Sequence, residues 1–220
     1  MCGKFTQLLA WREARDYPDF VKAREGPTET ATPMRFVNVL RLNVDRAREM
    51  RPMRWGFMGL KAATPAGPPE HIHARAETLD TKPTFRDAFA TARGILVGKT
   101  FNEGKEITPT KTEQHIITPR DGMRLASRCC GNAGVHNSND ELRTFVMVRT
   151  HANKLIGTIT DRMPAVIAPE HWGKWLGEEP ASAEELMALL QPFEGDWEME
   201  AEFKPPKWKP KRPSAQTELY

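Results

Sequence analysis

Short segments typical of β-strands recur along this 220-residue chain, and they constrain its fold more than any other feature. Apolar and polar residues alternate over 35–42, as expected for a strand with one buried face. Only a few segments with helical spacing lie between the strands. This order favours an α+β fold over repeated βαβ units, in which a helix would follow every strand. The other predicted strands span 53–57, 95–97, 115–118, 123–130, 144–149 and 164–167.

Several helices and one turn are predicted from their boundary residues. Thr84 is a candidate cap for a helix that ends at Gly94. Ser182 and Glu185 have the spacing of a capping box, in which each residue's side chain accepts from the other's backbone N–H. The Pro-Arg-Asp-Gly sequence at 119–122 predicts a hairpin between the strands on either side of it. Further helical segments are expected at 8–22, interrupted near Pro18, and around Trp172, Trp175 and Leu176.

The length and composition suit one domain followed by a tail. We expect a domain over residues 1–200 and a basic tail over 201–220. Residues 204–213 contain five cations, four prolines and Trp208, and the prolines favour an extended chain. Such a tail could follow a phosphate backbone and stack on a base, or it could be simply solvated.

The overall composition excludes several classes of protein. Hydrophobic residues make up 39% of the chain, and no stretch approaches the ~20 apolar residues of a membrane span. No apolar secretory signal is present at the N-terminus, so we expect a cytoplasmic protein without a membrane partner. The three cysteines form no disulfide framework. Cys129 and Cys130 lack the spacing of a metal or redox motif and are interpreted as strand residues.

Cys2 offers a reactivity that no internal cysteine has. Once Met1 is removed, its free α-amine and its thiol lie on adjacent carbons. The amine can condense with an aldehyde to a Schiff base, and the thiol can then close a five-membered thiazolidine ring. The α-amine has a pKa of about 7.7–8.0, so a useful fraction of it is neutral at pH 7. Alternatively, Cys2 has no role beyond its position near the start of the chain.

Five short motifs in a fixed order resemble those of the SRAP family, the SOS-response-associated peptidases. The resemblance covers roughly residues 2–176. Members of this family shield abasic sites in single-stranded DNA by covalent attachment. The motifs are Met1-Cys2-Gly3-Lys4-Phe5, Trp55-Gly56, Ala74-Arg75-Ala76-Glu77-Thr78, Phe101-Asn102-Glu103 and Asp161-Arg162-Met163-Pro164.

The resemblance implies a fold, a mechanism and a set of site residues. It implies mixed, mainly antiparallel and partly barrel-like sheets flanked by helices. Cys2 would capture the ring-opened deoxyribose aldehyde after Met1 is lost, possibly by self-processing. Glu103 would be the general acid and base for that processing and for ring closure. The expected DNA-binding residues are Lys4, Trp55 (which would pack against splayed DNA), Arg75 (which would hold a phosphate) and Arg162. Alternatively, Trp55 is an ordinary core residue, and Arg75 and Glu77 form a structural ion pair.

Two site positions depart from the family pattern. The family usually has asparagine where this chain has His73, and histidine where it has Thr160. Threonine has no side-chain pKa near neutrality and cannot replace a histidine as acid and base. In one interpretation the site is rearranged, and His73 supplies the imidazole that Thr160 lacks. In the other, the chain is a degenerate relative that binds DNA, or crosslinks without efficient reversal.

Three hypotheses for function therefore remain, in a protein that we expect to be a monomer. The first is covalent capture of abasic single-stranded DNA through Cys2, with possible strand nicking through the Schiff base. The second is noncovalent binding of single-stranded DNA, and the third is a cysteine peptidase acting on proteins. No cofactor is expected. His71 and His73 would share a face of a strand, but the spacing supplies no third ligand, so no metal site is predicted.

Overall fold

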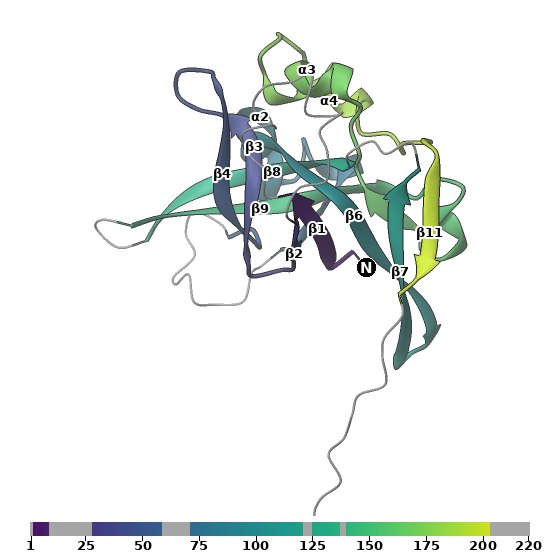
Figure 1. Cartoon of the computed structure of the whole chain (residues 1–220). Coiled ribbons are helices and arrows are strands. Elements are labelled where there is room, and N and C mark those ends of the chain that lie inside the picture. Colours follow the sequence, from purple (N-terminus) through teal and green to yellow (C-terminus); the bar gives the residue numbers. More distant parts are fainter. Residues whose placement is uncertain (1, 9–27, 59–70, 121–124, 137–139, 203–220) are drawn as a thin grey trace, which may run out of the picture.

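The computed structural model describes residues 2–8, 28–58, 71–120, 125–136 and 140–202 (Figure 1). Its architecture is α+β with a largely antiparallel sheet, so the predicted fold class is confirmed. Short helices and 3₁₀ turns account for part of the described residues outside the sheet. The strands are β1 (Lys4–Leu8), β2 (Thr28–Ala31), β3 (Phe36–Leu42), β4 (Arg48–Trp55), β5 (His73–Arg75), β6 (Arg93–Thr108), β7 (Lys111–Pro119), β8 (Leu125–His136), β9 (Asp140–His151), β10 (Arg162–Pro164) and β11 (Trp197–Ala201). The helices are α2 (Pro83–Thr91), α3 (Trp172–Leu176) and α4 (Ala183–Ala188), with 3₁₀ turns at Ala76–Thr78, Ile156–Thr158 and Pro169–His171.

The long strand β6 organises the sheet. Its first half pairs with β3 on one edge and β8 on the other, and its second half pairs with β1 and β7. These pairings are antiparallel, whereas β9 pairs in parallel with β4 and β5. The resulting arrangement is partly ring-like and brings the start of the chain beside the second half of β6 (Figure 1).

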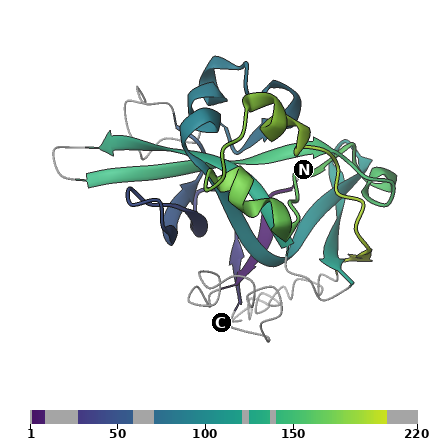
Figure 2. The same ribbon diagram turned by 90° about the horizontal axis from the view of Figure 1, so that it is seen from above.

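Alternate residues of the strands enter two separate hydrophobic clusters. In β9, Phe145 and Met147 belong to an inner cluster that also contains Cys2. Val146 and Val148 face the opposite way and pack with residues of α2, α3 and α4. The helices therefore cover one face of the sheet (Figure 2), while the other face encloses the start of the chain. Both faces are buried, which explains why several strands read as continuous apolar runs.

Most predicted strands are confirmed in longer form, but two local predictions for α2 are wrong. The helix begins at Pro83, after an N-cap at Lys82, and Thr84 does not cap it. Proline suits this first position because it needs no backbone donor there. The helix ends before Gly94, which lies inside β6. A Cβ at Gly94 would come within 2.6 Å of Val39 Cγ1, so close packing of strands explains this glycine.

The predicted hairpin around 119–122 is also wrong. The strand β7 pairs with β6 and β11, and β8 pairs with β6 and β9. No pairing between β7 and β8 is found in the described residues. The 16-residue strand β6 is long enough to pair with both of them end to end, which the local turn signal could not indicate.

The remaining local predictions divide into those confirmed and those outside the described residues. The capping box of Ser182 and Glu185 is present at the start of α4. Cys129 and Cys130 are strand residues of β8, with buried free thiols, as interpreted. The helix at 8–22 and the tail beyond residue 202 lie outside the described residues. No helix in the described ranges is long and apolar enough to cross a membrane.

Candidate active site

The site is built where the start of the chain meets β6. Lys4 of β1 lies opposite Asn102 of β6, and this register brings Cys2 near Glu103. Cys2 is completely buried, and its Sγ lies 3.8 Å from the backbone carbonyl oxygen of Lys4. Burial raises the pKa of the Cys2 thiol, and the negative charge of Glu103 raises it further. The thiol is therefore held in its neutral form.

Glu103 forms a buried ion pair with an arginine from another strand. Its carboxylate oxygen Oε1 accepts a hydrogen bond from Arg149 Nη2 at 3.1 Å, and both side chains are buried. Burial raises the pKa of the Glu103 carboxyl, while Arg149 opposes the rise. The result is a carboxyl that can exchange protons closer to neutrality than an ordinary glutamate.

Arg149 is a site residue that the sequence analysis did not identify. It lies on β9 in register with Arg75 of β5, and its Nη2 also donates to the carbonyl oxygen of Arg162 at 3.2 Å. A signal was present in the sequence, because Phe145, Met147 and Arg149 alternate toward the inner face of one strand. A cation at an inward position of a buried strand indicates a buried acidic partner.

His73 joins this group from β5. Burial and the neighbouring Arg149 lower the pKa of His73 to about 4, against a smaller opposing effect of the Cys2 backbone. The imidazole is therefore neutral at pH 7. Its Nε2 is buried and has no hydrogen-bond partner among the described residues. A neutral imidazole carries a proton on only one of its two ring nitrogens. The other nitrogen can accept a proton or a hydrogen bond.

Thr160 lies two residues after the 3₁₀ turn Ile156–Thr158 and is half-buried. Its backbone N–H donates to the carbonyl oxygen of Ile156 at 3.1 Å. Its side chain makes no hydrogen bond to Cys2, Glu103 or His73 within the described part of the chain. The described site thus gathers Cys2, Glu103, Arg149 and His73, without a titratable group from position 160.

The predicted DNA-binding cations have different surroundings. Arg75 is exposed, and its guanidinium makes no hydrogen bond or ion pair with any described residue. Arg162 Nη1 lies 2.5 Å from Glu77 Oε1, and His151 Nε2 lies 3.0 Å from the same oxygen. Glu77 therefore pairs with these two residues, and the alternative pairing with Arg75 is not observed.

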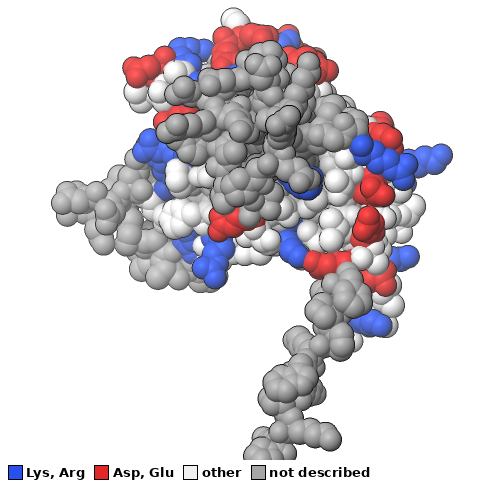
Figure 3. Space-filling view, viewed as in Figure 1, with Lys and Arg blue, Asp and Glu red and all other residues white. Residues whose placement is uncertain are grey.

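Lys4 pairs with an acidic residue near the end of the described chain. Its Nζ forms an ion pair with the Glu202 carboxylate. On the face shown in Figure 3, blue and red side chains lie next to one another at the top and along the right-hand side of the described surface. Contact of Lys4 with a phosphate would therefore require exchange of the Glu202 carboxylate for that phosphate.

Trp55, expected to pack against DNA, lies in the core instead. Only 1% of the residue is exposed, and its Nε1 donates to the carbonyl oxygen of Ile72 at 2.9 Å. Its ring stacks on Phe145 and meets the edge of His73, with ring centroids 6.1 and 6.2 Å apart. Contact with Trp55 thus helps to fix the orientation of the His73 ring. The φ angle of 139° at the following residue, Gly56, is one that side chains rarely adopt.

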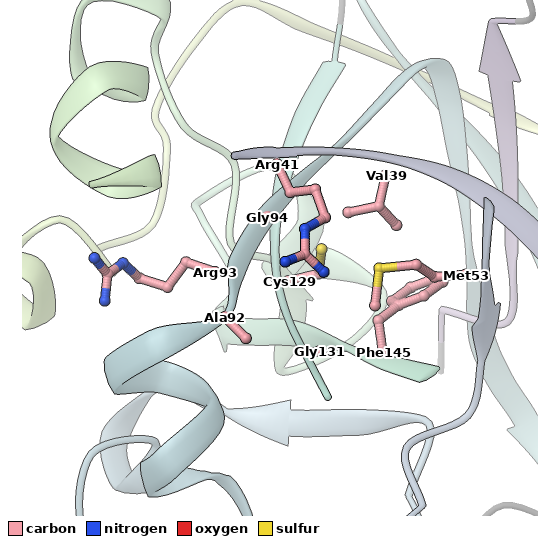
Figure 4. A pocket seen from close by; sticks show the side chains of 9 residues that line it. All are labelled: Val39, Arg41, Met53, Ala92, Arg93, Gly94, Cys129, Gly131 and Phe145. Atoms are coloured by element: carbon pink, nitrogen blue, oxygen red, sulfur yellow. The ribbon is translucent and has the colours of Figure 1, made fainter. Parts of the chain in front are cut away.

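The described residues contain no cluster of three potential metal ligands. His71 and His73 do not share a contact surface, because His71 packs on Phe85 in the cluster beneath the helices. A small cavity of about 10 Å³ lies elsewhere, lined by Arg41, Met53 and Cys129 among others (Figure 4). Its volume suits about one water molecule.

Comparison with known proteins identifies the family. The sequence model of the family described as "SOS response associated peptidase (SRAP)" matches residues 1–203 of the chain. The chain belongs to the SRAP family. The match covers every described residue of the candidate site, from Cys2 to Arg162.

Individual SRAP relatives resemble the chain over nearly its whole length. The abasic site processing protein YoaM of Bacillus subtilis is 29% identical over 91% of this chain and 89% of its own. The abasic site processing protein YoqW of Bacillus subtilis is 30% identical and covers 91% of each chain. A Bordetella bronchiseptica crystal structure has the same fold with a TM-score of 0.74, at 20% identity over 92% of this chain and 100% of that one. A crystal structure of a Bacteroides thetaiotaomicron protein has a TM-score of 0.70 and is 19% identical in sequence. That match covers 90% of this chain and 91% of the other.

Proposed function

We propose that this protein acts on abasic sites in single-stranded DNA and captures them covalently through Cys2 once Met1 has been removed. The observation that carries the proposal is the burial of Cys2 beside Glu103, Arg149 and His73. The names of the relatives support the abasic site as the target. The SRAP family match supports the same assignment.

The capture reaction proceeds in two steps, imine formation and ring closure. The Cys2 amine adds to the C1′ aldehyde of the open sugar, and the carbinolamine loses one water to give an imine. The thiol then adds across the C=N bond. Its sulfur bonds to C1′, and its proton passes to the nitrogen, which closes the thiazolidine ring. The whole reaction releases one water and needs no oxidant, reductant or cofactor.

Glu103 is the acid and base for these steps. Its protonated carboxyl donates to the carbinolamine hydroxyl as water leaves, and its carboxylate then accepts the thiol proton. The raised pKa of Glu103 keeps a protonated fraction available for the first role. The raised pKa of Cys2 makes the amine, rather than a thiolate, the first nucleophile. That order disfavours a cysteine peptidase, which would need the thiolate.

His73 serves as a neutral acceptor next to the reacting atoms. Its lowered pKa excludes the imidazolium form at pH 7, so it does not supply the charge of a protonated histidine. Exposed Arg75 has a guanidinium available for a phosphate beside the lesion. Nicking through the Schiff base and self-removal of Met1 would use the same Glu103 carboxyl.

The proposal is tested with single-stranded DNA that carries one abasic site, analysed on a denaturing gel. The wild type is expected to give a shifted band that survives denaturation, and intact DNA is expected to give none. Cys2→Ser keeps the amine, so it is expected to give a band only after borohydride reduction of the imine. Cys2→Ala gives the same expected result, because it also keeps the amine and lacks the thiol.

The same experiment separates the competing functions. A complex that dissociates on denaturation, resists borohydride trapping and weakens steeply with salt would indicate noncovalent binding instead. Absence of any adduct from protein shown by mass to begin at Cys2 would overturn covalent capture.

A further inference from the structure

His115 lies directly across from Glu103 on the neighbouring strand. The strands β6 and β7 are antiparallel, and Glu103 and His115 are register partners. Directly opposite residues project to the same face, with Cβ atoms about 4.5–5.5 Å apart. Phe101 and Ile117, two residues further along, are partners of the same orientation and are fully buried in the inner cluster. His115 therefore points to the same inner side as Glu103.

The two ring nitrogens of His115 have different surroundings. The residue is only 8% exposed, and its Nδ1 is buried without a hydrogen-bond partner in the described structure. Its Nε2 lies 3.2 Å from Glu113 Oε1, and the Glu113 side chain is 50% exposed. One ring nitrogen thus lies next to a carboxylate in contact with solvent. The other is a buried polar atom, and a buried polar atom without a hydrogen bond destabilises the folded state.

The charged groups around His115 are few. On β7, Glu113 lies two residues before it on the same face, and on β6 the partner of Glu113 is Lys105. The partner of His115 on β11 is Ala201, which carries no charge. The nearby Lys4–Glu202 pair is already neutralised internally. Among the described residues, Glu103 is therefore the titratable group directly opposite His115, and Arg149 holds it at 3.1 Å.

We propose that His115 is a positioning residue that passes protons between the surface carboxylate of Glu113 and the buried carboxyl of Glu103. This role rests on the proposed function, in which Glu103 must hold a proton before the carbinolamine can lose water. Before capture, His115 donates from Nδ1 to the Glu103 carboxylate and accepts a proton from the Glu113 side at Nε2. The ring ends neutral with its tautomer exchanged, and one proton has moved inward. Capture returns the thiol proton to Glu103, and the reverse transfers then restore the carboxylate and the original tautomer.

The need for such a path follows from two features of the chain. Glu103 is completely buried, so bulk water cannot protonate its carboxylate directly before capture. Position 160 is threonine and supplies no imidazole. His115 provides an imidazole from the neighbouring strand β7 instead.

The kinetic test measures adduct formation in a single turnover across pH. We expect His115→Phe to slow the reaction about tenfold at pH 8, where free protons are scarce, and added imidazole to restore part of the rate. His115→Gln keeps a hydrogen bond but cannot relay a proton, so it should resemble His115→Phe. Glu113→Gln should show a smaller loss. His171→Phe, which changes an exposed histidine, is the matched control and should react like the wild type.

A readout without DNA separates this proposal from the proposed function. Imidazole ¹⁵N NMR should show that Glu103→Gln moves the His115 Nδ1 resonance, whereas exposed Glu200→Gln should not. An unmoved resonance would overturn the coupling even if capture succeeds. If the wild type captures DNA and well-folded His115→Phe and His115→Gln react at its rate at every pH, the relay is wrong and the proposed function stands. If the wild type forms no adduct, the proposed function fails, and the NMR result alone decides whether His115 and Glu103 are coupled.

Discussion

Burial and the charge of Arg149 both act on the protonation of Glu103 and of His73. Glu103 gains a raised pKa from burial, and His73 gains a lowered one from burial and from Arg149. The resemblance of the sequence to SRAP proteins identified Glu103 and His73 as candidates. Arg149 lies outside the motifs that carry the resemblance. Its inward position in a buried strand indicates an acidic partner, but local alternation cannot show that this partner is Glu103, 46 residues away.

Replacing Glu103 should affect capture far more than folding. Glu103→Gln keeps the size of the side chain but cannot donate a carboxyl proton or accept one. We expect the rate of adduct formation to fall by roughly 10²–10⁴, the usual contribution of a general acid and base. The measurement is single-turnover gel analysis with abasic DNA. Glu200→Gln, on an exposed part of β11, is the control and should react normally.

His73 should make the fold sensitive to mild acid. Its pKa is about 4 in the folded chain and 6.5 ordinarily, so the unfolded state binds more protons between these values. Stability from this residue is complete above pH 6.5 and is lost as the pH falls toward 4. We expect the free energy of unfolding to drop by roughly 2 kcal/mol between pH 7 and pH 5 through His73 alone.

Urea unfolding at pH 7 and pH 5 checks this expectation. His73→Asn, which restores the residue usual in the family, should remove that part of the pH dependence. His171→Asn changes an exposed histidine and should leave it intact. Equal pH dependence in wild type and His73→Asn would show that the ring is not held neutral by the fold.

At the scale of elements, β6 unites the fold and the site. Its sequence predicted only a short buried strand at 95–97, yet it continues to Thr108 and pairs with β3, β8, β1 and β7. Local periodicity locates strands but contains no information on which strands pair over long separations. The mistaken hairpin at 119–122 has the same cause. The capping box at Ser182 was predictable because both of its partners are local.

The close approach of β1 to β6 is open to a direct test at Gly98. A Cβ there would lie 2.3 Å from Phe5 Cζ and 2.5 Å from the Thr6 backbone oxygen. Relieving the second contact requires a shift of the β1 backbone. We expect Gly98→Ala to destabilise the fold by about 1–3 kcal/mol and to slow capture, because β1 positions Cys2. Thermal unfolding and adduct formation are both measured.

Gly157→Ala is the matched control for that variant. A Cβ at Gly157 meets no atom within 4 Å, so the change should be neutral or slightly stabilising. If Gly98→Ala is as stable and as reactive as Gly157→Ala, then the contact between β1 and β6 does not hold Cys2 in place.

At the scale of the whole molecule, the sheet has helices on one face and the start of the chain within the other (Figures 1 and 2). The helix-covered cluster stabilises the fold. The inner cluster contains Cys2, Phe5 and Trp55, and the ring of Trp55 packs against His73. The SRAP resemblance predicted the general architecture. It did not predict that Trp55 would be buried, since the tryptophan motif is the same whether the ring faces DNA or the core.

The identity of the residue that carries the adduct is the direct test of covalent capture through Cys2. Protein crosslinked to abasic single-stranded DNA is digested with nuclease and trypsin, and the modified peptide is sequenced by mass spectrometry. We predict that the sugar remnant lies on the peptide Cys2-Gly3-Lys4, without Met1, and with the loss of one water that thiazolidine formation requires. A remnant on any lysine, or an adduct on protein that retains Met1, would contradict it.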